Sequence, residues 1–445
     1  MSIARTPLAA FGVVLATACA LLFVLALGAD SYGLIQNPYV GILIFGALPL
    51  GLLLGLVCIL VGNLLARRRG REVAWPVVNL ANRGQRIFVM SLLAASLVNI
   101  VILAAAGYGA VHYMETPSFC GQVCHEVMEP EYVGHAAGPH ANVTCVSCHV
   151  GSGANALVAS KVDGTRRLYK FVTNTASRPI PTPLAEMRPA RDTCATCHWP
   201  QKIHGDKLRV IKEYGDDEAS TETVTTLELH VGGGNSELGI GEGIHWHMNV
   251  DNQVEYVALD RERQDIPYVK LTTRAGEVRE FRRPGVTDEQ LAAGTRRLMD
   301  CTDCHNRPSH RFAPSAERAA DNALAVNEAP RTLPFVRREM VKALKTDAPD
   351  RDAAMAAIDA SLRAFYAAPD LPAPVAAADV DQVVRATQLV YRENVFPLMK
   401  IGWGTYRSEL GHVSSPGCFR CHDEEKVTAD GKTISQDCES CHAMR

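Results

Sequence analysis

The stretch His140-Ala-Asn-Val-Thr-Cys145-Val-Ser-Cys148-His149 contains two cysteines that are separated by two residues and followed directly by a histidine. Four other stretches repeat this spacing, and a fifth differs from it by one extra residue between the cysteines. Two thiols at this spacing can add to the vinyl groups of a haem while the adjacent imidazole binds the iron from one face. The repeated motif therefore predicts a fold packed around covalently attached haems.

The six motifs account for twelve of the 14 cysteines, and the one with the extra residue is Cys120-Gly-Gln-Val-Cys124-His125. The cysteines predicted to hold six haem c groups are Cys120, Cys124, Cys145, Cys148, Cys194, Cys197, Cys301, Cys304, Cys418, Cys421, Cys438 and Cys441. The predicted proximal iron ligands are His125, His149, His198, His305, His422 and His442.

Zinc ribbons and disulfides are the alternative explanations for paired cysteines. With 15 histidines in 445 residues, however, a histidine after all six pairs has a chance of roughly one in 10⁹. Disulfides would leave those histidines unexplained. The motifs therefore favour haem attachment.

Nine other histidines are available for six vacant distal positions, and neutral imidazole is a good iron ligand. The best distal candidates are His140, His310 and His412. His245 and His247 lie two residues apart, which on a strand would point them to the same side, and one of them is expected to bind iron. The remaining candidates are His230, His204, His135 and the thioether of Met128, with His112 the weakest. Because six-coordinate iron has no open position for a substrate, this inventory favours electron transfer over catalysis at a haem.

Most apolar residues of the first quarter lie in three uncharged runs, at about 8–29, 40–66 and 87–111. At 1.5 Å per residue, each run can cross the roughly 30 Å hydrocarbon core as a helix. The first run is too long for a cleavable signal peptide and is expected to be a retained anchor. Six arginines lie between the second and third runs, whereas no arginine or lysine lies between the first and second. The positive-inside rule then predicts a cytoplasmic N-terminus and a periplasmic haem domain at a bacterial inner membrane.

The charge balance differs between the two parts of the chain. Residues 1–111 carry a net charge of +5, and residues 112–445 hold 38 basic and 46 acidic residues, a net charge of −8. A nucleic-acid-binding protein, which needs a basic face, is therefore not expected. An acidic haem domain would instead attract a soluble acceptor that has a basic face.

The predicted fold class is a membrane-anchored multihaem cytochrome c. It has three N-terminal transmembrane helices and a mainly α, haem-packed periplasmic domain with a small antiparallel β insertion. Alternating segments at 223–231, 254–259, 268–273 and 278–282 indicate the strands. Helical patterns return after Thr287, whose hydroxyl is placed to cap the following helix. The expected regions are 1–111 (transmembrane helices), 112–205 (three haems), 206–285 (β insertion), 286–410 (helices with the fourth haem) and 411–445 (two haems).

Residues 108–200 resemble the NapC/NirT family of membrane-anchored multihaem quinol dehydrogenases. The resemblance is carried by Glu115-Thr-Pro-Ser-Phe-Cys120, Met128-Glu-Pro-Glu-Tyr132, the stretch 140–149 with the following Val-Gly-Ser-Gly, and Ser160-Lys161-Val-Asp-Gly164. Typical members have one span and four haems. This chain, with three spans, six motifs and an expanded first motif, is similar to the larger inner-membrane members associated with respiratory and extracellular electron transfer.

The resemblance implies a menaquinol site at the first haem, which is attached only nine residues beyond the third apolar run. Family members place a lysine and an acid near that haem. Lys161 matches the lysine position, and Asp163 is the candidate acid; the alternative is that both are solvated charges in a turn. Quinol oxidation releases two electrons and two protons, so it needs a group that relays protons.

The expected function is that of a quinol:cytochrome c type oxidoreductase. It would take electrons from the membrane quinol pool and pass them through six haems to a periplasmic cytochrome or terminal reductase in anaerobic respiration or extracellular electron transfer. A membrane complex or a homo-oligomer is compatible with this function. Two alternatives stay open. One is a multihaem terminal reductase of a small nitrogen or sulfur oxyanion, which requires one haem with an open face; the other is an assembly or sensor subunit.

Overall fold

The computed structural model describes residues 6–31, 43–68, 80–123, 125–151, 154–184, 188–199, 202, 205–233, 243–248, 251–369, 371–372 and 374–445. The chain divides into two compact units, Met1–His125 and Glu126–Arg445, and each is described by itself.

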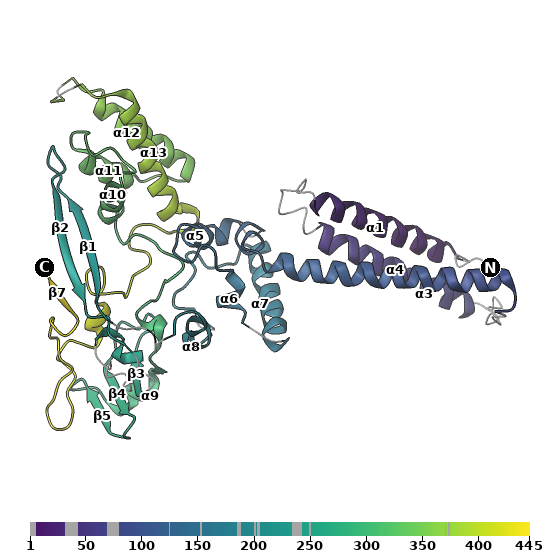
Figure 1. The fold of residues 1–445 in the computed structure, drawn as a ribbon, viewed down its shortest axis with the longest axis horizontal. Coiled ribbons are helices and arrows are strands. Elements are labelled where there is room, and N and C mark those ends of the chain that lie inside the picture. Colours follow the sequence, from purple (N-terminus) through teal and green to yellow (C-terminus); the bar gives the residue numbers. More distant parts are fainter. Residues whose placement is uncertain are drawn as a thin grey trace. The chain divides into compact units, whose positions relative to one another are not determined.

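The first unit consists of long apolar helices (Figure 1). They are α1 (Pro7–Ser31), α3 (Leu48–Arg68), which follows the π-helical turn η1 (Leu43–Ala47), and α4 (Arg83–Met114). Three stretches are long and apolar enough to cross a membrane: Pro7–Ala29, Leu43–Ala66 and Arg83–Met114. The prediction of three transmembrane helices is confirmed, although residues 40–42 of the second run lie outside the described residues.

Small residues let α1 and α3 approach closely. A Cβ atom placed on Gly12 would lie 2.5 Å from the carbonyl oxygen of Gly55, so neither position has room for a larger residue. This is the usual way in which helices pack in a membrane, where close backbone contact replaces the hydrophobic effect. Cys19 is buried in the same interface, beside Gly51, as expected for a small packing residue.

The second unit begins with helices that lie within or between the first three haem motifs. They are α5 (His125–Ala136), α6 (Cys145–His149), α7 (Ala154–Val172) and α8 (Ala190–Thr193). A separate bundle without cysteines follows later in the chain, formed by α10 (Ala316–Ala325), α11 (Val336–Leu344), α12 (Arg351–Tyr366) and α13 (Ala377–Asn394). Its apolar faces form one core, and Ser315 and Asp350 cap the N-termini of α10 and α12. All four helices lie after Thr287, where the sequence predicts helices.

The strands form two antiparallel sheets. The first has the order β1-β2-β7, with β1 (Lys207–Tyr214), β2 (Glu222–Leu229) and β7 (His442–Met444). The second has the order β5-β4-β3-β6, with β3 (Asn252–Ala258), β4 (Tyr268–Thr273), β5 (Val278–Arg282) and β6 (Thr295–Leu298).

The small antiparallel β insertion is confirmed as an element of the fold, but its strands extend beyond 206–285, because β6 and β7 lie outside that range. Both are four residues or shorter, too short for an alternating pattern to reveal them. The cap predicted at Thr287 is confirmed: Thr287 and Gln290 form a capping box at the start of α9 (Asp288–Ala293).

Candidate haem centres

The haem motifs lie on single helical turns. The motif histidine donates its backbone N–H to the carbonyl oxygen of the first motif cysteine, for example from His198 to Cys194 at 2.7 Å and from His305 to Cys301 at 2.8 Å. The motifs that begin at Cys418 and Cys438 make the same bond at 3.0 Å. This turn brings both cysteines and the histidine of a motif together, as attachment to one haem requires.

Five of the six predicted proximal histidines face a second histidine. Two imidazoles that bind one metal from opposite sides, each at about 2 Å, have ring centroids about 6 Å apart. The observed centroid distances are 6.1 Å for His149 and His310, 6.0 Å for His198 and His140, 6.3 Å for His305 and His245, 5.8 Å for His422 and His247, and 6.1 Å for His442 and His412. Each pair therefore has the spacing that a single iron between the rings requires.

Backbone carbonyls orient several of the second histidines. The Nδ1 atom of His310 lies 2.8 Å from the carbonyl oxygen of Glu131. The Nδ1 atom of His245 lies 3.1 Å from the carbonyl oxygen of Val231, and the Nδ1 atom of His247 lies 2.8 Å from the carbonyl oxygen of Ile244. With the proton on Nδ1, the Nε2 lone pair is left for a metal. Burial lowers the pKa of all three imidazoles, which favours the neutral, metal-binding form.

The other candidate histidines lie differently. His135 is buried, and its ring is 6.1 Å from that of His310, but its Nε2 atom already bonds the carbonyl oxygen of Val143 at 2.9 Å. The Nδ1 atom of His230 lies 3.3 Å from the Asp206 carboxylate. His112 stacks on a tyrosine of α4, and His204 lies outside the described residues. Among these histidines only His135 has the ring spacing of the opposed pairs, and its Nε2 bond to Val143 distinguishes it from them.

The expected strand at His245 and His247 is wrong, because both lie on the 3-10 helical turn η6 (Ile244–Met248). At three residues per turn, side chains two positions apart diverge by about 120° instead of pointing to the same side. The two rings consequently face different motif histidines, His305 and His422. One short turn thus serves two candidate haem centres, where the sequence suggested one ligand.

Sulfur atoms of successive motifs lie next to each other. Burial, then Cys145, then Cys197 of the following motif raise the pKa of Cys148. Contact with Cys301, followed by burial, raises the pKa of Cys194. The candidate centres at the second, third and fourth motifs are therefore consecutive in space as well as in sequence.

The same order continues toward the C-terminus. Burial and then Cys418 raise the pKa of Cys304 to about 12. Burial and then Cys441 raise the pKa of Cys418. The second to the sixth motifs thus form an unbroken series within the second unit.

Charged residues that the sequence analysis did not single out hold these motifs in place. Asp303, between the cysteines of the fourth motif, is 3% exposed, accepts a hydrogen bond from Tyr256 at 2.5 Å and pairs with Arg263 at 2.8 Å. Arg420, between the cysteines of the fifth motif, donates to the backbone carbonyl of Asp303 at 2.6 Å. A charged residue between two motif cysteines, where haem attachment does not require one, is the feature of the sequence that could have revealed this role.

A second buried pair supports a candidate distal ligand. The guanidinium of Arg307 binds both carboxylate oxygens of Glu131, at 3.0 and 2.8 Å, and both side chains are nearly buried. One of these oxygens also lies 3.3 Å from Nδ1 of His310. The pair therefore fixes the ring that faces His149.

The first motif has a wider turn than the others. Residues Phe119–Val123 form the π-helical turn η2, which accommodates the extra residue between the two cysteines. Cys124 itself lies outside the described residues. Met128 lies within α5, the helix that begins at His125, and its role as an iron ligand stays a prediction.

The predicted quinol residues lie in a helix, not in a turn. Lys161 and Asp163 both belong to α7, where residues two apart point in nearly opposite directions. Asp163 forms an ion pair with Arg167 at 2.6 Å. The structure thus does not bring Lys161 and Asp163 together as one proton-relaying pair.

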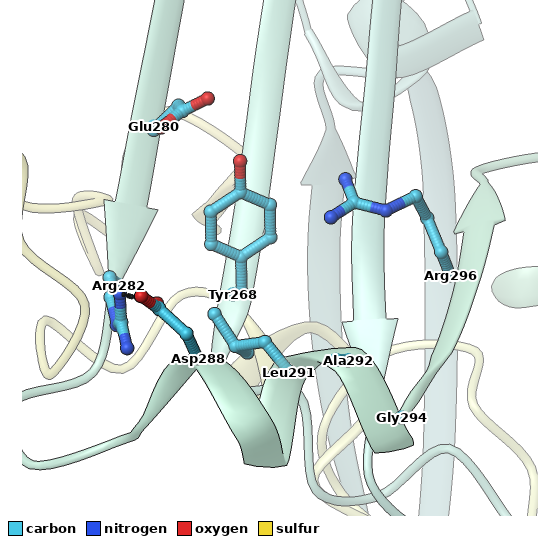
Figure 2. A pocket seen from close by; sticks show the side chains of 8 residues that line it. All are labelled: Tyr268, Glu280, Arg282, Asp288, Leu291, Ala292, Gly294 and Arg296. Atoms are coloured by element: carbon cyan, nitrogen blue, oxygen red, sulfur yellow. Dashed lines mark hydrogen bonds and ion pairs between the residues drawn. The ribbon is translucent and has the colours of Figure 1, made fainter.

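The donor set fits haem c better than the alternatives. Within the described residues, the motif cysteines form no disulfide, and no group of three or more His, Cys, Asp or Glu could hold a metal ion directly. A pocket of about 420 Å³ over the second sheet contains Tyr268, Arg296 and the ion pair of Arg282 with Asp288 (Figure 2). No motif residue or candidate iron ligand lines this pocket, so it is not part of the haem centres.

Comparison with known proteins gives two matches. Residues 82–180 match the NapC/NirT cytochrome c family, N-terminal region. The chain is 36% identical over 449 residues to the cytochrome c-type protein ImcH of Geobacter sulfurreducens, an alignment that covers 98% of this chain and 87% of the relative. No solved structure matches the chain.

Proposed function

Since the chain belongs to the NapC/NirT family of membrane-anchored c-type cytochromes, we propose that it is a quinol dehydrogenase that delivers electrons from menaquinol to a periplasmic acceptor. Family membership confirms the resemblance read from residues 108–200. It also establishes covalently bound haem c and a role in electron transfer at the membrane. The number of haems, the quinol substrate and the orientation in the membrane belong to the proposal.

The series of opposed histidine pairs is the observation that carries the proposal. The paired cysteines would hold the haems, and the histidines on both sides would saturate five of the irons. Haem c in these positions supplies one-electron transfer, and two such steps match the two electrons of a quinol. A terminal reductase needs an iron with an open face, which these pairs do not provide.

Six haems follow from six motifs, including the expanded first one. The mass of the mature protein should exceed that of the polypeptide by six haem groups. Replacing Cys120 by Ala should leave five fully attached haems and should not affect the other five, because the first motif lies on its own turn, η2. An unchanged haem content in this variant would remove the first motif from the proposal.

The haem domain is proposed to be periplasmic because six arginines lie between the second and third spans. A reporter that is active only outside the cytoplasm, fused after Arg445, should therefore be active. A reporter that is active only in the cytoplasm should work when it is inserted between the second and third spans. The reverse pattern would contradict the orientation.

Lys161 is proposed to relay the protons that quinol oxidation releases. Asp163 is the weaker candidate, since Arg167 already binds its carboxylate. In the haem-loaded protein, Lys161→Ala should slow haem reduction by a menaquinol analogue about 100-fold, the lower range for loss of a general acid or base. Lys342→Ala, the same change on a lysine of α11 that is 71% exposed, is the control and should not slow it. Equal rates in wild type and Lys161→Ala would remove Lys161 from the site.

A further inference from the structure

Helix α7 exposes an apolar side that no described part of the second unit covers. Val162, Leu168, Tyr169 and Val172 are 52, 50, 69 and 73% exposed. At 100° per residue, these four positions fall within about one third of the helix circumference. All residues from 164 to 170 are exposed, so this helix has little packing of its own against the haem domain.

The charge of α7 is opposite to that of the domain that carries it. The helix contains Lys161, Arg166, Arg167 and Lys170 against the single acid Asp163, a net charge of +3. Residues 112–445 as a whole carry a net charge of −8. Arg166, Arg167 and Lys170 lie on the side next to the apolar face, an arrangement typical of helices that lie in a membrane surface.

We propose that α7 is an interfacial helix whose apolar face enters the headgroup boundary of an anionic phospholipid bilayer. Its basic side chains then face the lipid phosphates, which attract them. An acidic protein partner would also attract these side chains, whereas a basic protein partner would repel them. Only 39 residues separate the end of the apolar helix α4 at Met114 from the start of α7 at Ala154, so the chain allows α7 to reach the bilayer. A lipid surface therefore satisfies the apolar face, the basic residues and the tether together.

This placement would explain why Lys161 and Asp163 point apart. Lys161 lies on the side of α7 that carries Leu168 and Val172, whereas Asp163 lies on the basic side with Arg167. The helix would present Lys161 to the lipid phase in which quinol is dissolved. This consequence rests on the proposed quinol oxidation, whereas the lipid contact itself does not.

The contact can be tested with a photo-crosslinking residue, p-benzoylphenylalanine, in the full-length, haem-loaded protein. The protein is placed in nanodiscs that contain phosphatidylglycerol, and the residue is introduced at Tyr169 in one variant and at Lys342, an exposed position of α11, in the control. Irradiation should attach phospholipid to position 169 at least five-fold more than to position 342, as measured by mass spectrometry. Zwitterionic phosphatidylcholine nanodiscs or high salt should lower the yield at position 169, because both weaken the attraction of the basic residues.

Three results would overturn the inference: equal lipid attachment at both positions, crosslinks from position 169 to the protein itself or to a second copy, or no adduct at either position. The absorbance of the covalent haems verifies that each variant is folded. Lipid attachment at position 169 supports the inference even if menaquinol fails to reduce the haems. That failure would contradict the proposed function alone.

Discussion

At the residue scale, the nitrogen that forms the hydrogen bond distinguishes His245 and His247 from His135. His245 and His247 engage a backbone carbonyl through Nδ1, which leaves Nε2 for iron. His135 is more deeply buried than either, but its Nε2 atom bonds Val143. Burial alone would have selected His135, whereas the hydrogen bonds favour His245 and His247.

Replacing a candidate distal histidine should open one iron. His140→Ala should convert one low-spin haem to high-spin, because the ring that faces His198 is removed. His135→Ala is the matched control and should leave the low-spin spectrum unchanged. Magnetic circular dichroism or electron paramagnetic resonance measures the haem spin states of both variants. A fully low-spin spectrum in His140→Ala would remove that residue as a ligand.

Glu131 is expected to tune the haem of the second motif through His310. Glu131→Gln removes a negative charge 3.3 Å from Nδ1 of His310 and leaves Arg307 without its anion. Since oxidised iron carries the greater positive charge, its reduction potential should rise by about 60 mV, a tenfold change in a one-electron equilibrium.

Glu129→Gln is the control for this prediction, because Glu129 lies on the same helix but pairs with Arg351 instead of a histidine. Redox titration followed in the visible spectrum measures both variants. A potential that stays constant or falls in Glu131→Gln would show that Glu131 does not act on this haem.

At the element scale, the sequence predicted the long elements well and the haem-binding loops poorly. The three apolar spans follow from long uncharged runs, and helices α10 to α13 follow from helical patterns that extend over nine or more residues. Strands β6 and β7 and the turn η6 have five residues or fewer, and their conformation depends on partners far along the chain.

The candidate iron ligands divide in the same way. Motif spacing gave the residues to which haems are proposed to attach. The distal candidates included the five that face motif histidines: His140, His245, His247, His310 and His412. The partner of each could not be read from the sequence. His310 lies five residues after His305, but it faces His149, because chain folding and not sequence distance brings two rings together.

The turn of the fourth motif should depend on its buried carboxylate. Asp303→Ala leaves Tyr256, Arg263 and the neighbouring Arg297 without their shared acceptor. Loss of one partner from a buried ion pair costs about 3–5 kcal/mol, so the free energy of unfolding should fall by about that amount. Asp288→Ala removes an 86% exposed partner of Arg282 and should change the free energy of unfolding little. Denaturant unfolding that gives equal losses for the two variants would show that Asp303 does not anchor this turn.

At the scale of the whole molecule, the acidic haem domain favours a basic acceptor. Two propionates on each haem would add to the net charge of −8 on residues 112–445. The rate of electron delivery to a soluble basic cytochrome should therefore fall as ionic strength rises, since salt screens long-range attraction beyond about 10 Å at 0.1 M. A stopped-flow rate that is independent of salt would show that charge does not guide the partner.

The order of the motifs in space gives the path along which electrons are expected to move through the molecule. The series from the second to the sixth motif begins close after the membrane helices in the chain and ends at the C-terminus, where His442 is both a motif histidine and the first residue of β7. Electrons that enter at the membrane would then leave from the part of the domain that the last motif occupies.

Anaerobic mixing of the purified, haem-loaded protein with a menaquinol analogue tests whether quinol itself reduces the haems. We expect rapid partial reduction of the haems, seen as growth of the reduced c-type α band, with no other protein present. Haems that stay oxidised in the presence of quinol but are reduced by dithionite would contradict it. The membrane helices would then serve only as an anchor, and electrons would enter from another protein.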